Sequence, residues 1–231
     1  MFQNTNYSFD NKDLFKDLPD DMRHIITDNI VKFRFLAGHS IFKEGLKPKG
    51  IYRVKKGKVK KFTATNFGTK HIFYICKENE YLGYHALLSD ELYADSASAL
   101  TDCEIEFISK THFEYALQKS PTLAYRLLKM LSHEFGVFLN ATKLLAKYTV
   151  RERAAINLLI LDSKFRIENN EKTEIKVNRE DLSNMVGTAK ESLVRMLKDF
   201  KQEQLIETKG RSIFILDHEG LLKVSNTSFF S

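Results

Sequence analysis

The sequence predicts an α+β protein built from an N-terminal β jelly-roll, one long helix and a C-terminal winged helix-turn-helix. Residues from about 15 to 110 contain many short apolar segments separated by turn residues, which is typical of jelly-rolls and barrels. Residues 120–149 carry a sustained heptad pattern. Residues 178–216 contain two short helical patterns around a glycine, followed by a hairpin pattern. We therefore divide the 231 residues into three regions, 1–119, 120–149 and 150–231.

The N-terminal region alternates strand and turn signals at short spacing. Residues 33–42 predict a strand, a turn and a second strand, and further strands are expected at 51–54, 59–62 and 71–75. The lysine-rich run at 55–61 resembles a nucleic-acid patch, but its alternation around Gly57 is also typical of a hairpin strand. We expect the hairpin, with its lysines facing water.

The long helix is expected to begin at Ser120 and Pro121, because serine is a good N-cap and proline suits the first helical position. Mostly apolar residues then recur at intervals of four and three, which is the spacing of a coiled-coil seam. This seam predicts a homodimer, although a buried helix of a monomer gives a similar pattern. A second apolar set, suited to cover the barrel, is Leu123, Leu127, Met130 and Val137. The predicted dimer seam is Ala124, Leu128, Leu131, Phe135, Phe138, Thr142 and Leu145.

The C-terminal region is expected to open with a helix at about 151–162, after a hinge at residues 148–150. The next helix has Asn178 as its N-cap and Gly187 at its end, where glycine adopts a left-handed backbone at little cost. Residues 188–191, TAKE, form a capping-box pattern that opens the following helix. A β-hairpin with a basic tip at 209–211 completes the wing. The apolar positions of the two helices are Leu182, Met185, Val186, Leu193, Leu197 and Phe200.

Positive charge is focused on the second helix and the wing of this module. The chain has a net charge of +6 and a pI near 9.1, which suits an anionic partner. From Arg151 onward the balance is only 14 Lys and Arg against 13 Asp and Glu, so the local clusters matter more than the total. A helix-turn-helix places its second helix in the major groove of DNA. The positive charges lie at Lys190, Arg195, Lys198 and Lys201 on the helix and at Lys209 and Arg211 on the wing. The residues expected to look outward from the helix toward DNA are Lys190, Glu191, Arg195 and Lys198.

Composition argues against several other classes of protein. Cys76 and Cys103 have no paired-thiol spacing, so we expect buried thiols rather than a redox pair or a metal site. No apolar run reaches the ~20 residues that span a bilayer, and the N-terminus lacks a secretory signal, so we expect a cytoplasmic protein with no membrane partner. The histidines show no metal-ligand spacing, and we expect neither a metal nor a cofactor. We find no Ser/His/Asp order, paired acids or phosphate loop, and expect no enzymatic activity.

Taken together, these segments resemble the Crp/Fnr family of bacterial transcription regulators over nearly the whole chain. Residues 35–45, FLAGHSIFKEG, and 51–59, IYRVKKGKV, are similar to that family's cyclic-nucleotide-binding-type barrel. Residues 151–155, RERAA, resemble the segment that opens its DNA-binding domain. Residues 178–187, together with Glu191 and Arg195, are similar to its helix-turn-helix.

The resemblance implies a role for each matching position. Glu191 and Arg195 would read base edges, and Lys190 would contact DNA nearby. Arg179 and Thr188 would touch phosphates. The chemistry is reasonable, since arginine can donate two hydrogen bonds to guanine and glutamate can accept one from cytosine. Two alternatives remain: Glu191 is also the third residue of the predicted capping box, and Arg195 is spaced to form a surface salt bridge with Glu191.

The barrel departs from the family at the positions that hold cyclic nucleotides. Members that bind them use an arginine followed by serine or threonine for the phosphate, and a glutamate for the ribose. Here Asp95 and Ser96 stand at the arginine–serine position, a tyrosine replaces the glutamate, and no arginine occurs between Arg53 and Arg126. An aspartate repels a phosphate, so we expect neither cAMP nor cGMP to bind. The pocket for a different effector is predicted at Tyr81, Tyr84, Asp95, Ser96 and Phe138.

The sequence therefore predicts a homodimeric, sequence-specific DNA-binding regulator of transcription. It would bind double-stranded DNA at an inverted repeat whose half-site centres lie ~10 bp apart. RNA polymerase is an expected further partner. Either a small-molecule effector fills the barrel, or the pocket is collapsed and the protein acts constitutively. The alternative is a ligand-binding or scaffold protein of the same fold that has lost DNA binding, against which the charged residues at 190, 191 and 195 argue.

Overall fold

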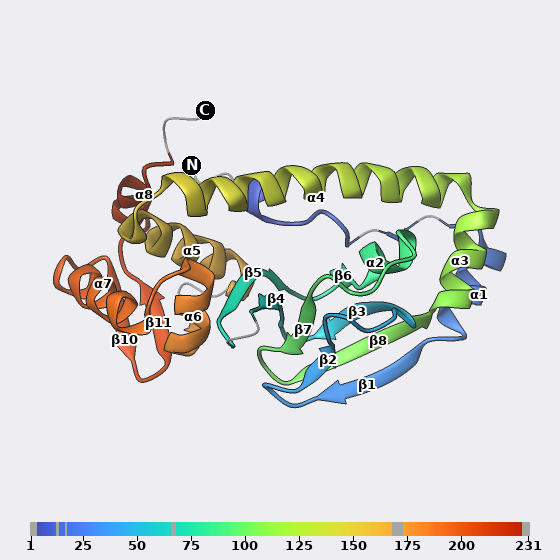
Figure 1. Cartoon of the computed structure of the whole chain (residues 1–231), viewed down its shortest axis with the longest axis horizontal. Coiled ribbons are helices and arrows are strands. Elements are labelled where there is room, and N and C mark those ends of the chain that lie inside the picture. The colour runs from blue at the N-terminus through green and yellow to red at the C-terminus, as the bar shows by residue number, and fades with distance from the viewer. Residues whose placement is uncertain (1–3, 13, 17, 66–67, 168–172, 228–231) are drawn as a thin grey trace. The chain divides into compact units, whose positions relative to one another are not determined.

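The computed structural model describes residues 4–12, 14–16, 18–65, 68–167 and 173–227 of the chain. Packing divides the protein into two compact units. The barrel unit comprises Phe9–Gly136, and the C-terminal unit comprises Val137–Ser231 together with Met1–Ser8. The long helix α4, Pro121–Lys147, contributes residues to both units (Figure 1). The three regions drawn from the sequence stay a prediction.

Two four-stranded sheets form the barrel unit, which confirms the predicted N-terminal β architecture. The pairings among the described strands of this unit are all antiparallel. The first sheet has the order β1 (Val31–Phe35), β8 (Cys103–Ser109), β3 (Gly50–Lys56) and β6 (Tyr81–Leu82). The second has the order β2 (Ser40–Phe42), β7 (Ser96–Ala99), β4 (Val59–Ala64) and β5 (Lys70–Cys76).

The lysine-rich run at 55–61 joins two strands, with Lys55 and Lys56 exposed as expected, but the predicted pairing of these strands as a hairpin is wrong. Gly57 turns the chain with a φ of 90°, but β3 pairs with β8 whereas β4 pairs with β7, so the two strands lie in different sheets. A Cβ at position 57 would lie 2.3 Å from the Asp102 carbonyl oxygen, so only glycine fits this turn. Lys61 does not face water: it is 3% exposed, and its Nζ lies 3.4 Å from Asp95 Oδ2.

Three short helices accompany the sheets, and the sequence predicted none of them. They are α1 (Asp20–Thr27), α2 (Tyr84–Leu88) and α3 (Lys110–Lys119). α1 follows Pro19 and α2 follows Gly83, and neither of these N-cap residues provides a side-chain cap hydrogen bond. Helices as short as α1 and α2, without cap signals, leave little periodicity to detect, whereas α3 has a side-chain cap from Ser109. α1 packs beside α3 (Figure 1).

Helix α4 buries its second apolar set and exposes much of its seam, although Leu131 of the seam packs against the barrel core. The Ser120 hydroxyl accepts a hydrogen bond from the Leu123 amide at 3.2 Å, so the predicted N-cap is confirmed. Leu123, Leu127 and Met130 are buried in the core of the barrel unit. On the seam, Leu128 is 60% exposed and Phe135 is 65% exposed in the single chain. A large apolar stripe on a helix surface needs a partner, which favours the dimer over the buried monomeric helix.

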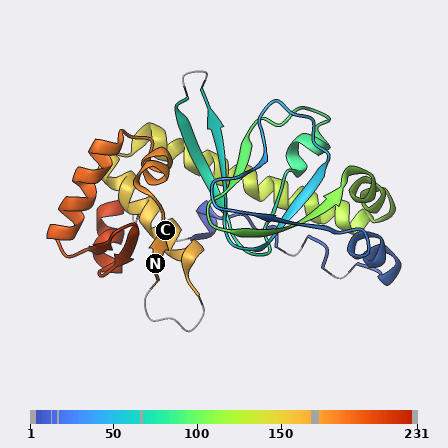
Figure 2. The ribbon, with the colours of Figure 1, turned by 90° about the horizontal axis from the view of Figure 1, so that it is seen from below.

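The C-terminal unit contains the predicted winged helix-turn-helix. The wing strands pair antiparallel, and a third, unpredicted strand pairs with the second of them. Figure 2 shows α7, in dark orange, at the rim of this unit. The described elements are η1 (Asn4–Tyr7), α5 (Val150–Phe165), β9 (Ile175–Lys176), α6 (Arg179–Val186), α7 (Lys190–Gln202), β10 (Ile206–Lys209), β11 (Ser212–Ile215) and α8 (His218–Ser225).

Neither cysteine forms a disulfide and both side chains are buried, which agrees with the prediction of buried thiols. No helix in the described ranges is both long and apolar enough to cross a membrane. Over the same ranges, no cluster of three or more His, Cys, Asp or Glu side chains could hold a metal ion.

Candidate functional site

The helix-turn-helix is held together by the local signals that the sequence carries. Asn178 Oδ1 accepts a hydrogen bond from the Asp181 amide at 2.7 Å, so the predicted N-cap of α6 is confirmed. Gly187 ends the helix in the left-handed region with a φ of 67°, as predicted. Five of the six predicted apolar positions are at most 4% exposed, and Met185 is 7% exposed, so the two helices share one small core: Leu182, Met185, Val186, Leu193, Leu197 and Phe200.

The predicted capping box at residues 188–191 does not form, and this corrects the sequence interpretation. Helix α7 begins one residue later, with Ala189 at the N-cap and no side-chain cap. The Thr188 amide instead donates to the Ser183 carbonyl at 3.1 Å, which continues the turn from α6. Glu191 is therefore the second residue of α7, not the third, and its carboxylate is not used for capping. A capping box occurs at α5, where Thr149 is the N-cap and Glu152 the third residue.

The outer face of α7 carries the charged side chains in an exposed row. Lys190, Glu191, Arg195 and Lys198 are all exposed, and Val194 between them is 47% exposed. Arg195 Nη2 lies 3.5 Å from Ser192 Oγ, a long hydrogen bond at most. Among the described ion pairs none joins Arg195 to Glu191, so both groups present their charges to solvent. The alternative of a surface salt bridge between Arg195 and Glu191 is therefore not observed.

Arg179, at the start of α6, reaches the wing. Its Nη2 donates to the Gly210 carbonyl at 3.4 Å, and burial lowers the pKa of its guanidinium. Its Nη1 is buried and has no hydrogen-bond partner among the described residues. A cation in this state gains from an anion placed beside it, since the unused donor would then be satisfied. Arg211 is exposed at the wing tip, and Lys209 pairs with Glu207 at 3.4 Å.

Arg153, on α5, fixes the turn between the two helices, and the sequence reasoning assigned it no role. Its Nε donates to the Val186 carbonyl at 2.8 Å, and its Nη2 donates to the Gly187 carbonyl at 3.1 Å. Its Nη1 donates to the Tyr148 carbonyl, just after α4, at 2.8 Å. Carbonyls at a helix end lack intrahelical partners, so one guanidinium satisfies groups of two helix ends. The only sequence signal was the segment at 151–155, which marked a family resemblance without a function for this arginine.

Gly187 is a point at which a side chain should be costly. A Cβ there would lie 2.9 Å from Leu145 Cδ2, and the positive φ adds strain for any other residue. We expect Gly187→Ala to lower the free energy of unfolding by about 1–2 kcal/mol from the backbone alone, with a further loss from the Leu145 contact. Thermal unfolding checks this. Gly210→Ala is the matched control, because Gly210 has a φ of 58° and nothing within 4 Å of its Cβ. Equal losses in the two variants would exclude the contribution from Leu145.

Four of the five residues predicted for an effector pocket lie in the barrel unit: Tyr81, Tyr84, Asp95 and Ser96. Asp95 pairs with buried Lys61, and Ser96 Oγ accepts a hydrogen bond from the Glu44 amide at 3.0 Å. Tyr81 lines a cavity of about 290 Å³ in the barrel unit. Phe138 belongs to the C-terminal unit. The assignment of these residues to an effector stays a prediction.

Tyr84 takes part in a buried polar network on the barrel side of α4. Its hydroxyl donates to Glu134, which is 1% exposed, and it accepts from Asn11 Nδ2 at 2.9 Å. His85 Nε2 lies 2.8 Å from the other carboxylate oxygen of Glu134. Burial, together with the charge of Glu134, raises the pKa of Tyr84 well above its usual range, so the phenol stays protonated and remains the donor. The sequence missed this network because its members are far apart along the chain.

Comparison with known proteins agrees with this architecture. Residues 32–120 match the family model for the cyclic nucleotide-binding domain, and residues 152–224 match that for the Crp-like helix-turn-helix domain. The chain is 30% identical over 185 residues to the transcriptional activator protein Anr of Pseudomonas protegens, covering 78% of this chain and 74% of that protein. It is 25% identical over 195 residues to the fumarate and nitrate reduction regulatory protein of Vibrio cholerae, covering 83% of this chain and 77% of that protein.

Solved structures show the same fold. FixK2 from Bradyrhizobium japonicum has a TM-score of 0.77 at 20% identity, covering 84% of this chain and 96% of its own. A transcriptional regulator of the CRP/FNR family from Thermus thermophilus has a TM-score of 0.71 at 23% identity, covering 84% of this chain and 98% of its own. With the helix-turn-helix geometry and the relatives above, the chain belongs to the Crp/Fnr family of DNA-binding transcription regulators.

Proposed function

We propose that the protein acts as a homodimer that binds an inverted-repeat operator, with α7 of each subunit in the major groove. The observation that carries the proposal is the exposed row on α7, in which Arg195 and Glu191 are not paired with each other. Arg195 would donate two hydrogen bonds to a guanine, and Glu191 would accept one from a cytosine. The remaining contacts would be made by Lys190, Lys198, Arg179, Thr188 and Arg211.

The dimer would form along α4 through the seam residues Ala124, Leu128, Leu131, Phe135, Phe138, Thr142 and Leu145. Their spacing suits packing against an identical helix, and the exposed fractions of Leu128 and Phe135 in the single chain support a second copy as the occupant. An inverted repeat also requires a protein with two-fold symmetry. RNA polymerase is the proposed further partner, and we infer no enzymatic activity.

Selection from a random DNA pool, with purified protein and no added ligand, tests the proposal. A palindromic motif with half-site centres about 10 bp apart is the expected result. If nothing is enriched without a ligand but a motif appears with an effector, the dimer model stands and the protein requires activation. Failure in both conditions would favour a ligand-binding or scaffold protein that has lost DNA binding.

We expect cAMP and cGMP not to bind. Asp95 places a carboxylate where the family holds the cyclic phosphate, and the nearest buried cation, Lys61, is already paired with it at 3.4 Å. Like charges in a shielded site repel more strongly than in water. Isothermal titration calorimetry with each nucleotide should therefore give no saturable heat. A dissociation constant in the micromolar range for either nucleotide would contradict the prediction.

Replacing Arg179 with alanine should weaken binding to every DNA sequence by a similar factor. A phosphate contact carries no base information, and its loss should flatten the slope of log K against log salt concentration by about 0.9. Affinities for operator and scrambled DNA at several salt concentrations measure this. Lys223→Ala, which removes an exposed charge from α8, is the control and should leave the slope unchanged. A loss confined to the operator sequence would mean that Arg179 reads bases.

A further inference from the structure

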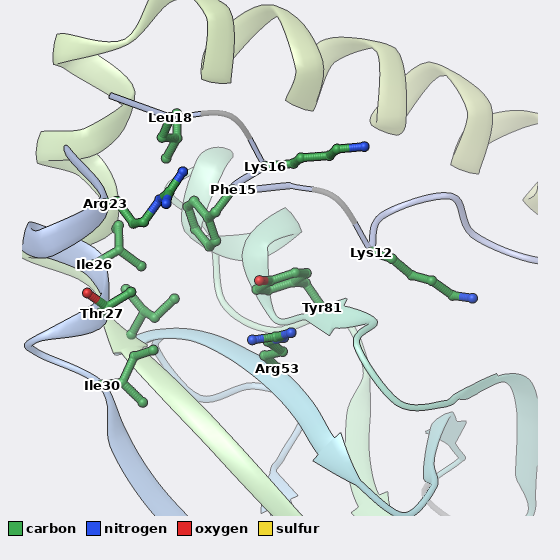
Figure 3. A pocket seen from close by; sticks show the side chains of 11 residues that line it. Lys12, Phe15, Lys16, Leu18, Arg23, Ile26, Thr27, Ile30, Arg53 and Tyr81 are labelled. Carbon is green, nitrogen blue, oxygen red and sulfur yellow. The ribbon is translucent and has the colours of Figure 1, made fainter. Parts of the chain in front are cut away.

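A cavity of about 290 Å³ lies in the barrel unit between the N-terminal segment, α1 and the sheet that contains β3, β6 and β8 (Figure 3). Four of its lining residues carry a positive charge: Lys12, Lys16, Arg23 and Arg53. None of the described residues that line it is acidic. A concave site whose described lining residues include four cations favours anions.

Arg53, on β3, supplies a preorganised guanidinium at the floor of the cavity. Its Nη1 lies 3.1 Å from Glu106 Oε2, and its Nη2 donates to Asn79 Oδ1 at 2.6 Å. These two contacts hold the group in place but use only part of its five N–H donors. Its Nε is buried and has no hydrogen-bond partner among the described residues, so a ligand would meet the remaining N–H groups of Nη1 and Nη2. The side chain is 28% exposed, so it is anchored on one side and accessible on the other.

Aromatic and aliphatic side chains form the apolar part of the cavity. The rings of Phe15 and Tyr81 meet edge to face, with centroids 5.4 Å apart, and the Arg53 guanidinium carbon lies 5.9 Å from the Tyr81 centroid. In Figure 3, Phe15 and Tyr81 lie above Arg53, with Ile26 and Ile30 to one side. The cavity therefore has an apolar wall and a cationic floor, and suits a ligand with both characters.

The other three cations that line the cavity differ in how close they lie to the aromatic rings and the Arg53 guanidinium. Arg23 on α1 lies next to Phe15 in Figure 3, and its contact with Asp20, at 3.9 Å, is too long for a hydrogen bond. Lys12 and Lys16 point away from the aromatic rings (Figure 3). The two arginines are thus the candidate ligands of an anionic group, and the two lysines add positive potential nearby.

We propose that this cavity binds a small organic anion, a carboxylate or a phosphate ester, attached to an apolar ring or branched group. The anionic group would accept hydrogen bonds from Arg53 and Arg23, and the apolar part would pack on Phe15, Tyr81 and the isoleucines. Arginine pairs with carboxylate and phosphate through two parallel N–H donors, so either group fits. The site shares only Tyr81 with the effector pocket predicted from the family resemblance, and it does not depend on DNA binding.

Isothermal titration calorimetry of the full chain, without DNA, tests the proposal. The probes are 1-naphthoate, 1-naphthyl phosphate and the neutral 1-naphthamide, which share one ring system. We expect at least one anion to bind with a dissociation constant below about 1 mM, and the amide at least about tenfold more weakly. The comparison of the two anions tells which anionic group the cavity prefers. Equal binding of anions and amide, or no binding of either anion, would overturn the proposal.

Two variants locate the site. Arg23→Gln removes an exposed charge from the cavity, and Arg53→Lys keeps the charge near Glu106 but removes the planar donor group. Each should weaken binding of the anion by about fivefold or more, while the weak binding of the amide changes little. Lys32→Gln removes an exposed charge from β1 outside the cavity and should change neither. An equal loss of anion binding in Lys32→Gln and Arg23→Gln would assign the effect to net charge and overturn the site.

Discussion

Replacing both Leu128 and Phe135 with glutamate is expected to give a monomer that no longer binds its operator specifically. The two side chains are 60% and 65% exposed in the single chain and lie on the predicted seam of α4. Four buried carboxylates, two from each chain, would face one another across a two-fold axis, which an apolar interface cannot accommodate. A monomer contacts one half-site only, so we expect the affinity for the operator to fall by about 10³-fold or more, toward non-specific binding.

Light scattering gives the molar mass, and an electrophoretic mobility assay gives the affinity for a selected operator. Lys129→Glu is the control, because it adds a glutamate to an exposed position of α4 outside the seam. The control should remain dimeric and should retain most of its affinity. If the double variant stays dimeric and binds the operator normally, the two subunits meet elsewhere and α4 has a different partner.

Removing the Arg195 side chain should have the second largest effect, and it should depend on sequence. If this arginine reads a guanine, Arg195→Ala should cost about 1–3 kcal/mol on the operator and relax one base position in each half-site. Selection from a random DNA pool, with wild type and variant in parallel, measures both effects. Arg195 is in the first half of α7, the part of a recognition helix that contacts base edges.

Lys201 provides a matched control for the loss of one positive charge. It is exposed in the last turn of the same helix. Lys201→Ala should weaken all sequences slightly and leave the selected motif unchanged. If Arg195→Ala behaves in the same way, with a uniform loss and an unchanged motif, Arg195 contacts the phosphate backbone and another residue reads the base.

The C-terminal unit could be predicted from the sequence because its signals are local. Asn178 as a cap, Gly187 as a helix end and apolar residues at helical spacing each depend on neighbours within a few positions. The same signals failed one turn later, at residues 188–191. There the amide of Thr188 bonds back to Ser183, so the helix starts at Lys190 and the apparent capping box is out of register. A capping box can form only when the backbone amide of its first residue is not already bonded to the preceding turn.

The barrel unit was predicted in class but not in its polar interior. The spacing of strands and turns identified the β architecture, but it did not indicate that β3 and β4 pair in different sheets. The burial of Lys61 against Asp95, far along the chain, follows from that pairing. The same holds for Asn11, whose side chain reaches Glu134 at 3.2 Å. Contacts between distant positions depend on the tertiary fold, and no periodicity in the sequence encodes them.

The three hydrogen bonds of Arg153 link the end of the long helix to the helix-turn-helix. A single rigid, planar group binds the last turn of the DNA-reading module's first helix, the bend after it and the exit of the long helix. A rotation of the C-terminal end of the long helix is therefore transmitted to these hydrogen bonds. It must either carry the module with it as one piece or break a hydrogen bond. We therefore expect two arrangements, with these hydrogen bonds kept or broken, and an operator affinity that switches between two levels.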